Sequence, residues 1–531
     1  MPPIDYAMPY ASARSPVFGR AAVATSQPLA TAAGIEMLLA GGNAVDAAVA
    51  AAMTLTVVEP NGCGLGSDAF AIVWDGTRLH GLDASGRSPA GWTAERFAGR
   101  TRMPTRGWDA VTVPGAVSGW AALSGRFGRL PFERLAAPAI RHAREGFAVT
   151  PIIADLWARA APILKDQPGF ADVFLPGGRA PAAGETFRSE AHARSLEVIA
   201  ATRGEALYRG ALAEAIAAQA KRDGGMLSLD DLGEHQAEWV EPLSQAFAGH
   251  VVHELPPAGQ GVATLMALGM LGSLGSPRTD PDDPWSTHLA IEATKLALAD
   301  LYAHVADREA MAVRSRDLLD PGYLAERARL IDASRAGEPG HGAPARGGTV
   351  CLSAADADGM MISYIQSNYL HFGSGVVVPG TGISLQNRGA GFVLEPGHPN
   401  AVGPRKRPFH TIIPGFVTDA DGAPRMAFGL MGGPMQAQGH VQLALRILAA
   451  GQNPQAAADA PRWRVTGGVG LAVEPEMDER AVETLRTLGH EVTLENDKEA
   501  FNFGGAQIVL KTDAGYVAGS DPRKDGMAIG L

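Results

Sequence analysis

The start of the chain has a helical hydrophobic pattern that is interrupted once. The stretch "TAAGIEMLLAGGNAVDAAVAAAMTLTVV" (31–58) predicts two helices broken at Gly41–Gly42. Asn43 is the expected N-cap of the second helix, because its side chain can accept a backbone N–H there. The next run, "AFAIVWDGTRLHGLDA", predicts a pair of strands with Asp75–Gly76 as the hairpin turn.

Helical and strand patterns are unevenly distributed over the rest of the chain. Helices are expected near 130–145, 190–202, 211–222, 286–306, 316–333, 434–450 and 479–488. Strands are expected at 349–356, 360–367, 425–429, 506–511 and 515–519. Between them, "AGEPGHGAPARGG" (336–348) is rich in Gly, Pro and Ala and predicts a loop. Mixed elements with a sheet-rich last third indicate an α+β fold in a layered sandwich.

Length and composition describe a large globular protein. The 531 residues predict two or more domains or one unusually large layered unit. The chain is 46% hydrophobic and 19% charged, which is enough apolar material for a large core. A net charge of −11 argues against a nucleic-acid partner, and the most basic group, "PRKRP" (404–408), is too short for a basic arm.

Cysteine usage and the N-terminal residues indicate a cytoplasmic protein. The two cysteines, Cys63 and Cys351, are too few for a disulfide framework and lack the spacing of a metal site. The first 16 residues show no basic segment followed by an apolar one, so no signal peptide is expected. The most apolar run, 48–58, is too short to span a bilayer.

Two groups of residues could suggest a cofactor or metal site, but neither has the pattern that such a site requires. The loop "NGCGLGSD" (61–68) resembles a dinucleotide-binding loop, but that loop must follow a strand and open a helix. Here a helix is expected before it and a strand after it, so a Gly-rich structural turn is the better interpretation. The histidines, which include His288, His371, His398, His410 and His440, show no paired metal-ligand spacing. No cofactor and no metal are expected.

Thr349 is the candidate nucleophile. A Thr that opens a strand is usually only a β-branched residue in a favourable place. This one follows Gly347–Gly348 at the end of a loop, where its hydroxyl can attack the Gly348 carbonyl and shift the acyl group from nitrogen to oxygen. Water then cleaves the ester and leaves Thr349 with a free α-amino group, whose ordinary pKa of roughly 7.7–8.0 suits a general base.

Eight motifs in order resemble the γ-glutamyltransferase family of N-terminal-nucleophile hydrolases, over nearly the whole chain. They are "GGNAVDAAVAAAMTLTVVEP" with "GLGSDAF", "VTVPGAVSGW", "ELPPAGQGVATL", "EATKLALAD", "GTVCLSAADADG", "FGSGVVVPGTGISLQN", "KRPFHTIIPG" and "GLMGGP". The resemblance implies a precursor that cuts itself between Gly348 and Thr349. The large piece, 1–348, mostly helical, and the small piece, 349–531, then remain together in one αββα sandwich. Two such heterodimers could pair.

The resemblance also implies roles for particular residues. Thr349 takes the nucleophile position, with Ser353 and Asp356 completing the family pattern. Ser367 takes the position of a hydroxyl residue beside the nucleophile. Gly432 and Gly433 match the pair whose backbone N–H groups form the oxyanion hole, where each donor can be worth about 2.7–4 kcal/mol.

The residues expected to bind substrate depart from the family pattern. They are Arg87, Asn368, Tyr369, Asn387, His410 and Thr411. Ser85 stands where glutathione-using members place a carboxylate-binding Arg, with Arg87 two residues further on and Arg388 as a second candidate. Gly391 stands where those members hold the substrate amine with Asp. Cys351 is a conceivable rival nucleophile, but packing is the better interpretation for it.

We therefore expect a self-processing threonine amidohydrolase that acts on a small carboxylate-bearing amide and needs no cofactor. The altered pocket resembles the family branch that includes oxamate amidohydrolases, and acylases that remove dicarboxylic side chains are also related. Three alternatives stay open: ordinary glutathione hydrolysis or γ-glutamyl transfer, such an acylase, and an unprocessed relative that only binds a carboxylate or a protein. A dinucleotide oxidoreductase built on 61–68 is the weakest hypothesis.

Overall fold

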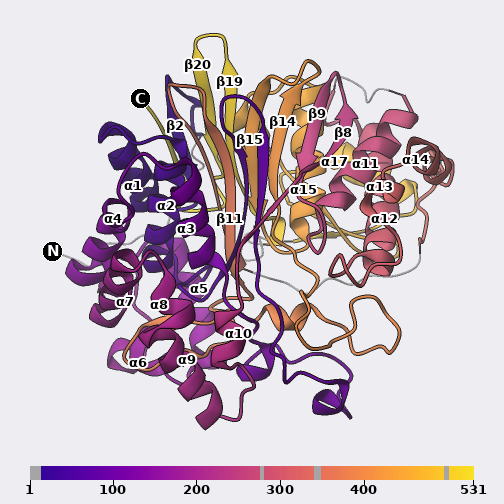
Figure 1. Cartoon of the computed structure of the whole chain (residues 1–531). Coiled ribbons are helices and arrows are strands. Elements are labelled where there is room, and N and C mark those ends of the chain that lie inside the picture. Colours follow the sequence, from indigo (N-terminus) through magenta and orange to yellow (C-terminus); the bar gives the residue numbers. More distant parts are fainter. Residues whose placement is uncertain (1–12, 276–279, 340–347, 496–501) are drawn as a thin grey trace, which may run out of the picture.

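Two antiparallel sheets packed face to face form the centre of the molecule, and helices cover both outer faces (Figure 1). The computed structural model describes residues 13–275, 280–339, 348–495 and 502–531. The four layers confirm the expected αββα sandwich, so the chain forms one large layered unit. Residues 340–347 of the predicted loop and the first 12 residues lie outside the described residues.

Each central sheet combines strands from before and after Thr349. In order, one sheet contains β21 (Met527–Gly530), β2 (Ala22–Thr25), β10 (Gly348–Ala355), β11 (Met361–Tyr369), β3 (Asp68–Trp74), β4 (Leu79–Ala84) and β7 (Glu238–Val240). The other contains β1 (Val17–Gly19), β20 (Gly515–Ser520), β19 (Gly505–Thr512), β15 (Pro424–Met431), β14 (Pro414–Asp419), β9 (His250–Glu254) and β8 (Leu243–Phe247).

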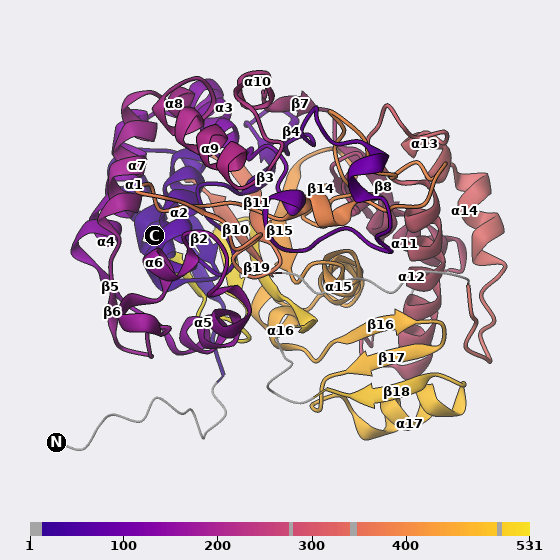
Figure 2. The ribbon, with the colours of Figure 1, turned by 90° about the horizontal axis from the view of Figure 1, so that it is seen from below.

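The helices fall into two groups, one on each outer face (Figure 1). On the β10 side they are α1 (Pro28–Leu39), α2 (Ala44–Val58), α3 (Ala116–Phe127), α4 (Phe132–Glu145), α5 (Pro151–Leu164), α6 (Phe170–Phe174), α7 (Glu190–Ala201), α8 (Glu205–Arg209), α9 (Ala211–Arg222) and α10 (Leu229–Gly233). On the β15 side they are α11 (Gly261–Ser273), α12 (Pro284–His304), α13 (Ser315–Leu318), α14 (Pro321–Ala328), α15 (Met435–Ala444), α16 (Pro454–Asp459) and α17 (Glu479–Thr487). A small sheet of β16 (Trp463–Gly467), β17 (Gly470–Val473) and β18 (Glu491–Leu494) lies beside α12 and α17 (Figure 2).

Most predicted elements are confirmed, including the two helices separated by Gly41–Gly42. Asn43 caps α2 as expected, in a reciprocal capping box with Asp46. The helix predicted over 316–333 is instead the pair α13 and α14, because Asp320 caps a new helix that starts at Pro321. Several elements were not predicted, among them α3, α5, α11, β2 and β14. Strands β8 and β9 were also missed, because their short, half-buried pattern carries little hydrophobic signal.

The apolar run at 48–58 lies within α2, every residue of which is buried in the protein. It packs between α1, α4 and the sheet strand β10. Across the described ranges, no helix combines the length and apolar character needed to cross a membrane.

The interior between the sheets decides the role of Cys351. Its side chain is fully buried there, together with Ile365, Phe416 and Val509. A Cβ added at Gly429 on the facing strand β15 would come 2.3 Å from Cys351 Sγ, so the thiol fills the space that the glycine leaves. Burial raises the pKa of the Cys351 thiol. Cys351 therefore packs between the sheets, as the sequence indicated.

Candidate functional site

Thr349 lies at the head of β10, and its side chain is buried. Its Oγ1 is 3.1 Å from the Oγ of Ser367 on the neighbouring strand β11. Ser367 Oγ also accepts a hydrogen bond of 2.7 Å from the backbone N–H of Tyr369. The β10–β11 register shifts between Gly348 and Val350, so the nucleophile candidate sits in a local irregularity of the ladder.

Alternation along the strands turns both hydroxyls toward the opposite sheet. On β10, Ser353 donates to the Gln507 carbonyl of the other sheet, and on β11, Ser363 donates to the Phe428 carbonyl. Ser367 lies an even number of residues from Ser363, so it shares the inter-sheet face, and its contact with Thr349 brings that hydroxyl to the same face. Both lie at the same end of their strands, because β10 and β11 are antiparallel.

Gly432 and Gly433 follow β15 directly and precede α15. The contacts of β10 and β11 with Phe428 and Gly429 place this end of β15 toward the Thr349 end of the facing sheet. Both glycines have positive φ values, 125° and 61°, which side chains rarely tolerate. A Cβ at Gly432 would also lie 2.9 Å from the Gly504 Cα. The turn can therefore present backbone N–H groups without a side chain in the way.

A buried acid–imidazole pair adjoins the hydroxyl pair. Asp68, the first residue of β3, is the ladder partner of Ser367. Its Oδ2 lies 3.2 Å from His410 Nε2, and its Oδ1 accepts from the Gly86 N–H. Burial raises the pKa of Asp68 to about 7, with Arg388 opposing the rise. Burial, with Arg388 and Arg407 nearby, lowers the pKa of His410 well below its usual range, so the imidazole is neutral.

Arg388 is the charged centre of this cluster. It begins a short 3₁₀ turn after Asn387 and is completely buried. Its Nη1 donates to Thr411 Oγ1 at 2.9 Å, and its guanidinium carbon lies 4.3 Å from the centre of the Tyr369 ring. Burial lowers the pKa of Arg388 to about 10, so the group stays cationic at neutral pH.

The two asparagines among the predicted substrate residues serve as scaffold contacts. Asn368 accepts from the Ser67 hydroxyl and donates to Ser384 Oγ. Asn387 accepts from the Leu370 N–H and donates to the Thr105 carbonyl. Their side-chain amides therefore hold loops around the site in place.

The Gly-rich segment 61–68 joins α2 to β3, the opposite order to that of a dinucleotide loop. Its glycines allow close approach to the site: the Gly62 carbonyl accepts from the Asn368 N–H. A Cβ on Gly64 would come 2.1 Å from Ser384 Oγ. This segment is a structural turn, as expected, but it also delivers Asp68 to the site. Asp68 was not among the residues predicted for the site, although it is the last residue of the motif "NGCGLGSD".

Arg87 contacts a different set of residues from those around Arg388. Its side chain is 33% exposed and pairs with Asp307 at 3.1 Å and with Glu238 at 3.7 Å. It lines a cavity of about 430 Å³ together with Arg405, Arg407 and other residues. Asp307 is the nearer partner, because Glu238 lies closer to Arg407, at 2.7 Å, and to Arg308, at 3.0 Å.

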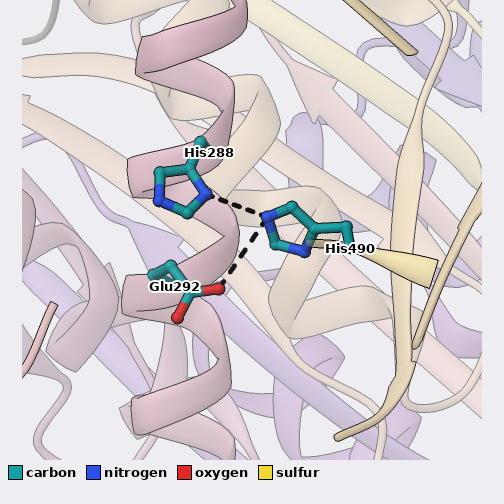
Figure 3. Close-up of side chains that lie close together, drawn as sticks. All are labelled: His288, Glu292 and His490. Atoms are coloured by element: carbon teal, nitrogen blue, oxygen red, sulfur yellow. Dashed lines mark hydrogen bonds and ion pairs between the residues drawn. The ribbon is translucent and has the colours of Figure 1, made fainter. Parts of the chain in front are cut away.

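Within the described residues, one histidine–carboxylate group has the geometry of a metal-site candidate. Ligand atoms of His288, Glu292 and His490 lie within 4.8 Å of one another (Figure 3). His288 Nδ1 and His490 Nε2 are 2.9 Å apart and share a hydrogen bond. Lys295 Nζ lies 2.7 Å from Glu292 Oε1 and already supplies a cation at that oxygen. The donor set therefore fits a hydrogen-bonded core cluster better than a metal centre.

Comparisons with known proteins agree over the whole length of the chain. The family model "Gamma-glutamyltranspeptidase" matches residues 30–531. The oxamate amidohydrolase proenzyme of Klebsiella pneumoniae is 37% identical over 94% of this chain and 97% of the relative. The glutathione hydrolase-like YwrD proenzyme of Bacillus subtilis is 34% identical over 95% of this chain and 97% of the relative.

Solved structures give the same result. The cephalosporin acylase from Bacillus halodurans superposes with a TM-score of 0.94 at 44% identity and covers 99% of both chains. The residues matched by the family model include β10, where the Thr349 and Ser367 hydroxyls meet. The protein therefore belongs to the gamma-glutamyltranspeptidase family of N-terminal-nucleophile hydrolases and is an enzyme.

Proposed function

We propose that the protein is a self-processing threonine amidohydrolase acting on a small amide that carries a carboxylate. The observation that carries this proposal is the Thr349 hydroxyl, held 3.1 Å from Ser367 at the head of a central strand and directly after a glycine. Relatives of this chain are named proenzymes, which supports cleavage of a precursor.

Processing begins with attack of Thr349 Oγ1 on the Gly348 carbonyl carbon. The C–N bond breaks, the Thr349 nitrogen becomes an amine, and the acyl group is left as an ester on Oγ1. Water hydrolyses that ester and frees residues 1–348 and 349–531. The pieces stay together, because β10 pairs on one side with β2 of the large piece and both sheets mix strands of the two.

In the mature enzyme the Thr349 amine removes the proton from its own hydroxyl as Oγ1 attacks the substrate amide. The Gly432 and Gly433 N–H groups stabilise the tetrahedral oxyanion, and the leaving nitrogen departs with the shuttled proton. Water then attacks the acyl-threonine and releases the acid. Another amine in place of water would give transfer.

The substrate class follows from the charge of the site and from the relatives. Arg388 and a partly protonated Asp68 give the cluster positive character, which suits a carboxylate. Gly391 offers no acid to hold a substrate ammonium group, which disfavours γ-glutamyl compounds. The names of two relatives, oxamate amidohydrolase and cephalosporin acylase, support oxamate and dicarboxylyl amides as substrates to try first.

Of the substrate contacts expected from the sequence, Tyr369, His410 and Thr411 lie nearest to Arg388 and are proposed to contact the substrate. The side chains of Asn368 and Asn387 are engaged in loop contacts and are proposed to shape the site rather than to bind the substrate. Arg87 keeps its proposed role only if a substrate displaces its two carboxylate partners. A cytoplasmic location and a pairing of heterodimers stay predictions from the sequence.

Mass spectrometry and N-terminal sequencing of the purified protein test the proposal. By residue share of 55.2 kDa, cleavage gives pieces of about 36 and about 19 kDa, and the smaller begins Thr-Val-Cys-Leu. Ammonia release is then measured with oxamate, glutamine and glutaramate, and glutamate release with glutathione. A single intact chain without turnover would favour the alternative, an unprocessed relative that only binds carboxylates.

A further inference from the structure

The buried guanidinium of Arg388, which stacks on the Tyr369 ring, leaves two of its three nitrogens without a hydrogen bond within the described residues. Arg388 is completely buried, and Nη1 alone donates to a protein acceptor, Thr411 Oγ1. Nε and Nη2 have no hydrogen-bond partner within the part of the chain that the structure describes. Buried charged groups are normally paired, because removal from water without compensation is costly.

The two unused groups form a matched pair. Nε–H and one N–H of Nη2 lie on the same edge of the planar guanidinium and point in parallel, which is the geometry of a bidentate carboxylate contact. Thr411 on Nη1 and the Tyr369 ring beneath the plane fix the orientation of this edge. The Nε–H and Nη2–H groups are therefore already oriented for a carboxylate acceptor.

Within the described residues, no carboxylate accepts from Nε or Nη2 of Arg388. Asp68 is the nearby acid, but its oxygens are engaged by His410 Nε2 and by the Gly86 N–H. Burial keeps its pKa near 7, so at neutral pH it compensates Arg388 only in part. The charge of this cluster is therefore only partly compensated, which favours binding of one more anion.

The position relative to Thr349 is also fixed. Tyr369 is the ladder partner of Gly348, the residue before the nucleophile, and its ring lies directly under Arg388. One side chain therefore separates the guanidinium from the head of β10. An anion on Arg388 would lie within reach of a small molecule that also contacts Thr349.

Resting on the proposed function, we propose that Arg388 binds the substrate carboxylate through Nε and Nη2 and so selects carboxylate-bearing amides. Arg87 is the competing candidate, but two acids already hold it at a partly exposed position. Selectivity arises because a neutral amide leaves both donors of a buried cation without an acceptor.

The test compares oxamate with oxamide, a neutral compound of nearly the same shape. In Arg388→Met, kcat/KM for oxamate should fall on the order of 100-fold more than kcat/KM for oxamide. Arg388→Lys should give an intermediate loss, because it keeps the charge without the fork. Arg388→Gln is a second neutral variant for the case in which the Met variant does not fold.

Arg126→Met is the matched control, since Arg126 also stacks on an aromatic ring, with its guanidinium carbon 4.4 Å from the Trp239 ring centre. It should keep the wild-type oxamate-to-oxamide ratio. An equal fall for both substrates in Arg388→Met, or a collapse of the ratio in Arg87→Met instead, would overturn the proposal.

Calorimetry separates this proposal from the proposed function. Oxalate and glutarate are titrated into wild-type protein and into Arg388→Met. Binding of either acid that weakens at least about 30-fold in the variant supports the carboxylate site even if the wild type hydrolyses no amide. Binding of neither acid, or equal binding to both proteins, refutes it even if oxamate is hydrolysed.

Discussion

The hydroxyl oxygens of Thr349 and Ser367 lie 3.1 Å apart at the adjoining ends of β10 and β11. This contact joins the residue that would become the new N-terminus to a neighbour that also accepts the Tyr369 N–H. The hydroxyl of the proposed nucleophile is thereby oriented by a strand rather than by a loop.

Replacing Thr349 should stop processing. Thr349→Ala removes the attacking oxygen, so the chain should run as one band near 55 kDa on a denaturing gel and release no ammonia from oxamate. Thr349→Ser keeps an oxygen at that position and should still be cut. Normal cleavage of the Ala variant would place the nucleophile elsewhere.

Ser367→Ala should slow both cleavage and turnover, by about tenfold if one hydrogen bond of the usual strength is lost. The matched control is Ser363→Ala, on the same strand and face, whose hydroxyl donates to the Phe428 carbonyl. The control should lower the melting temperature without changing kcat. Equal kinetic effects in both variants would reduce Ser367 to a packing role.

Asp68 should make stability fall as pH rises. Its folded pKa of about 7 lies above its ordinary value of 3.8, so the folded state binds the extra proton. The resulting stabilisation is complete below pH 3.8 and is lost as pH rises through 7. Urea unfolding at several pH values should show this slope in the wild type and a weaker slope in Asp68→Asn.

The same titration should affect substrate binding. Ionised Asp68 competes with a substrate carboxylate for the field of Arg388, so KM for oxamate should rise above pH 7. A pH-rate profile in Asp68→Asn should lack this rise. A rise that persists in the variant would assign the titration to another group.

The Glu292–Lys295 pair should be structural and independent of metal. Lys295→Met leaves a buried carboxylate uncompensated and should cost about 3–5 kcal/mol of unfolding free energy. The double variant with Glu292→Gln should recover part of that loss. Wild-type protein should melt at the same temperature with zinc or with a chelator; a clear upward shift with zinc would indicate that His288, Glu292 and His490 hold the ion.

Local sequence patterns were sufficient to predict many of the helices and strands. Asn43 capped α2 as predicted, because capping depends on neighbours three residues away. The helix predicted over 316–333 was divided by an Asp–Pro pair, whose capping signal is equally local and could have been used. Strands β8 and β9 escaped detection because their half-buried pattern has meaning only inside a sheet.

The sequence by itself determined the layered fold class, the family motifs and Thr349 as the candidate nucleophile. These depend on short patterns and on their order along the chain. Only the tertiary structure decided which side chains surround it. Asp68 meets His410 across 342 positions, and among the residues that the structure describes Nε and Nη2 of Arg388 find no acceptor, whereas Arg87 pairs with Asp307. Such contacts form only when the two sheets pack face to face. No local sequence pattern encodes the burial that shifts the pKa values of these residues.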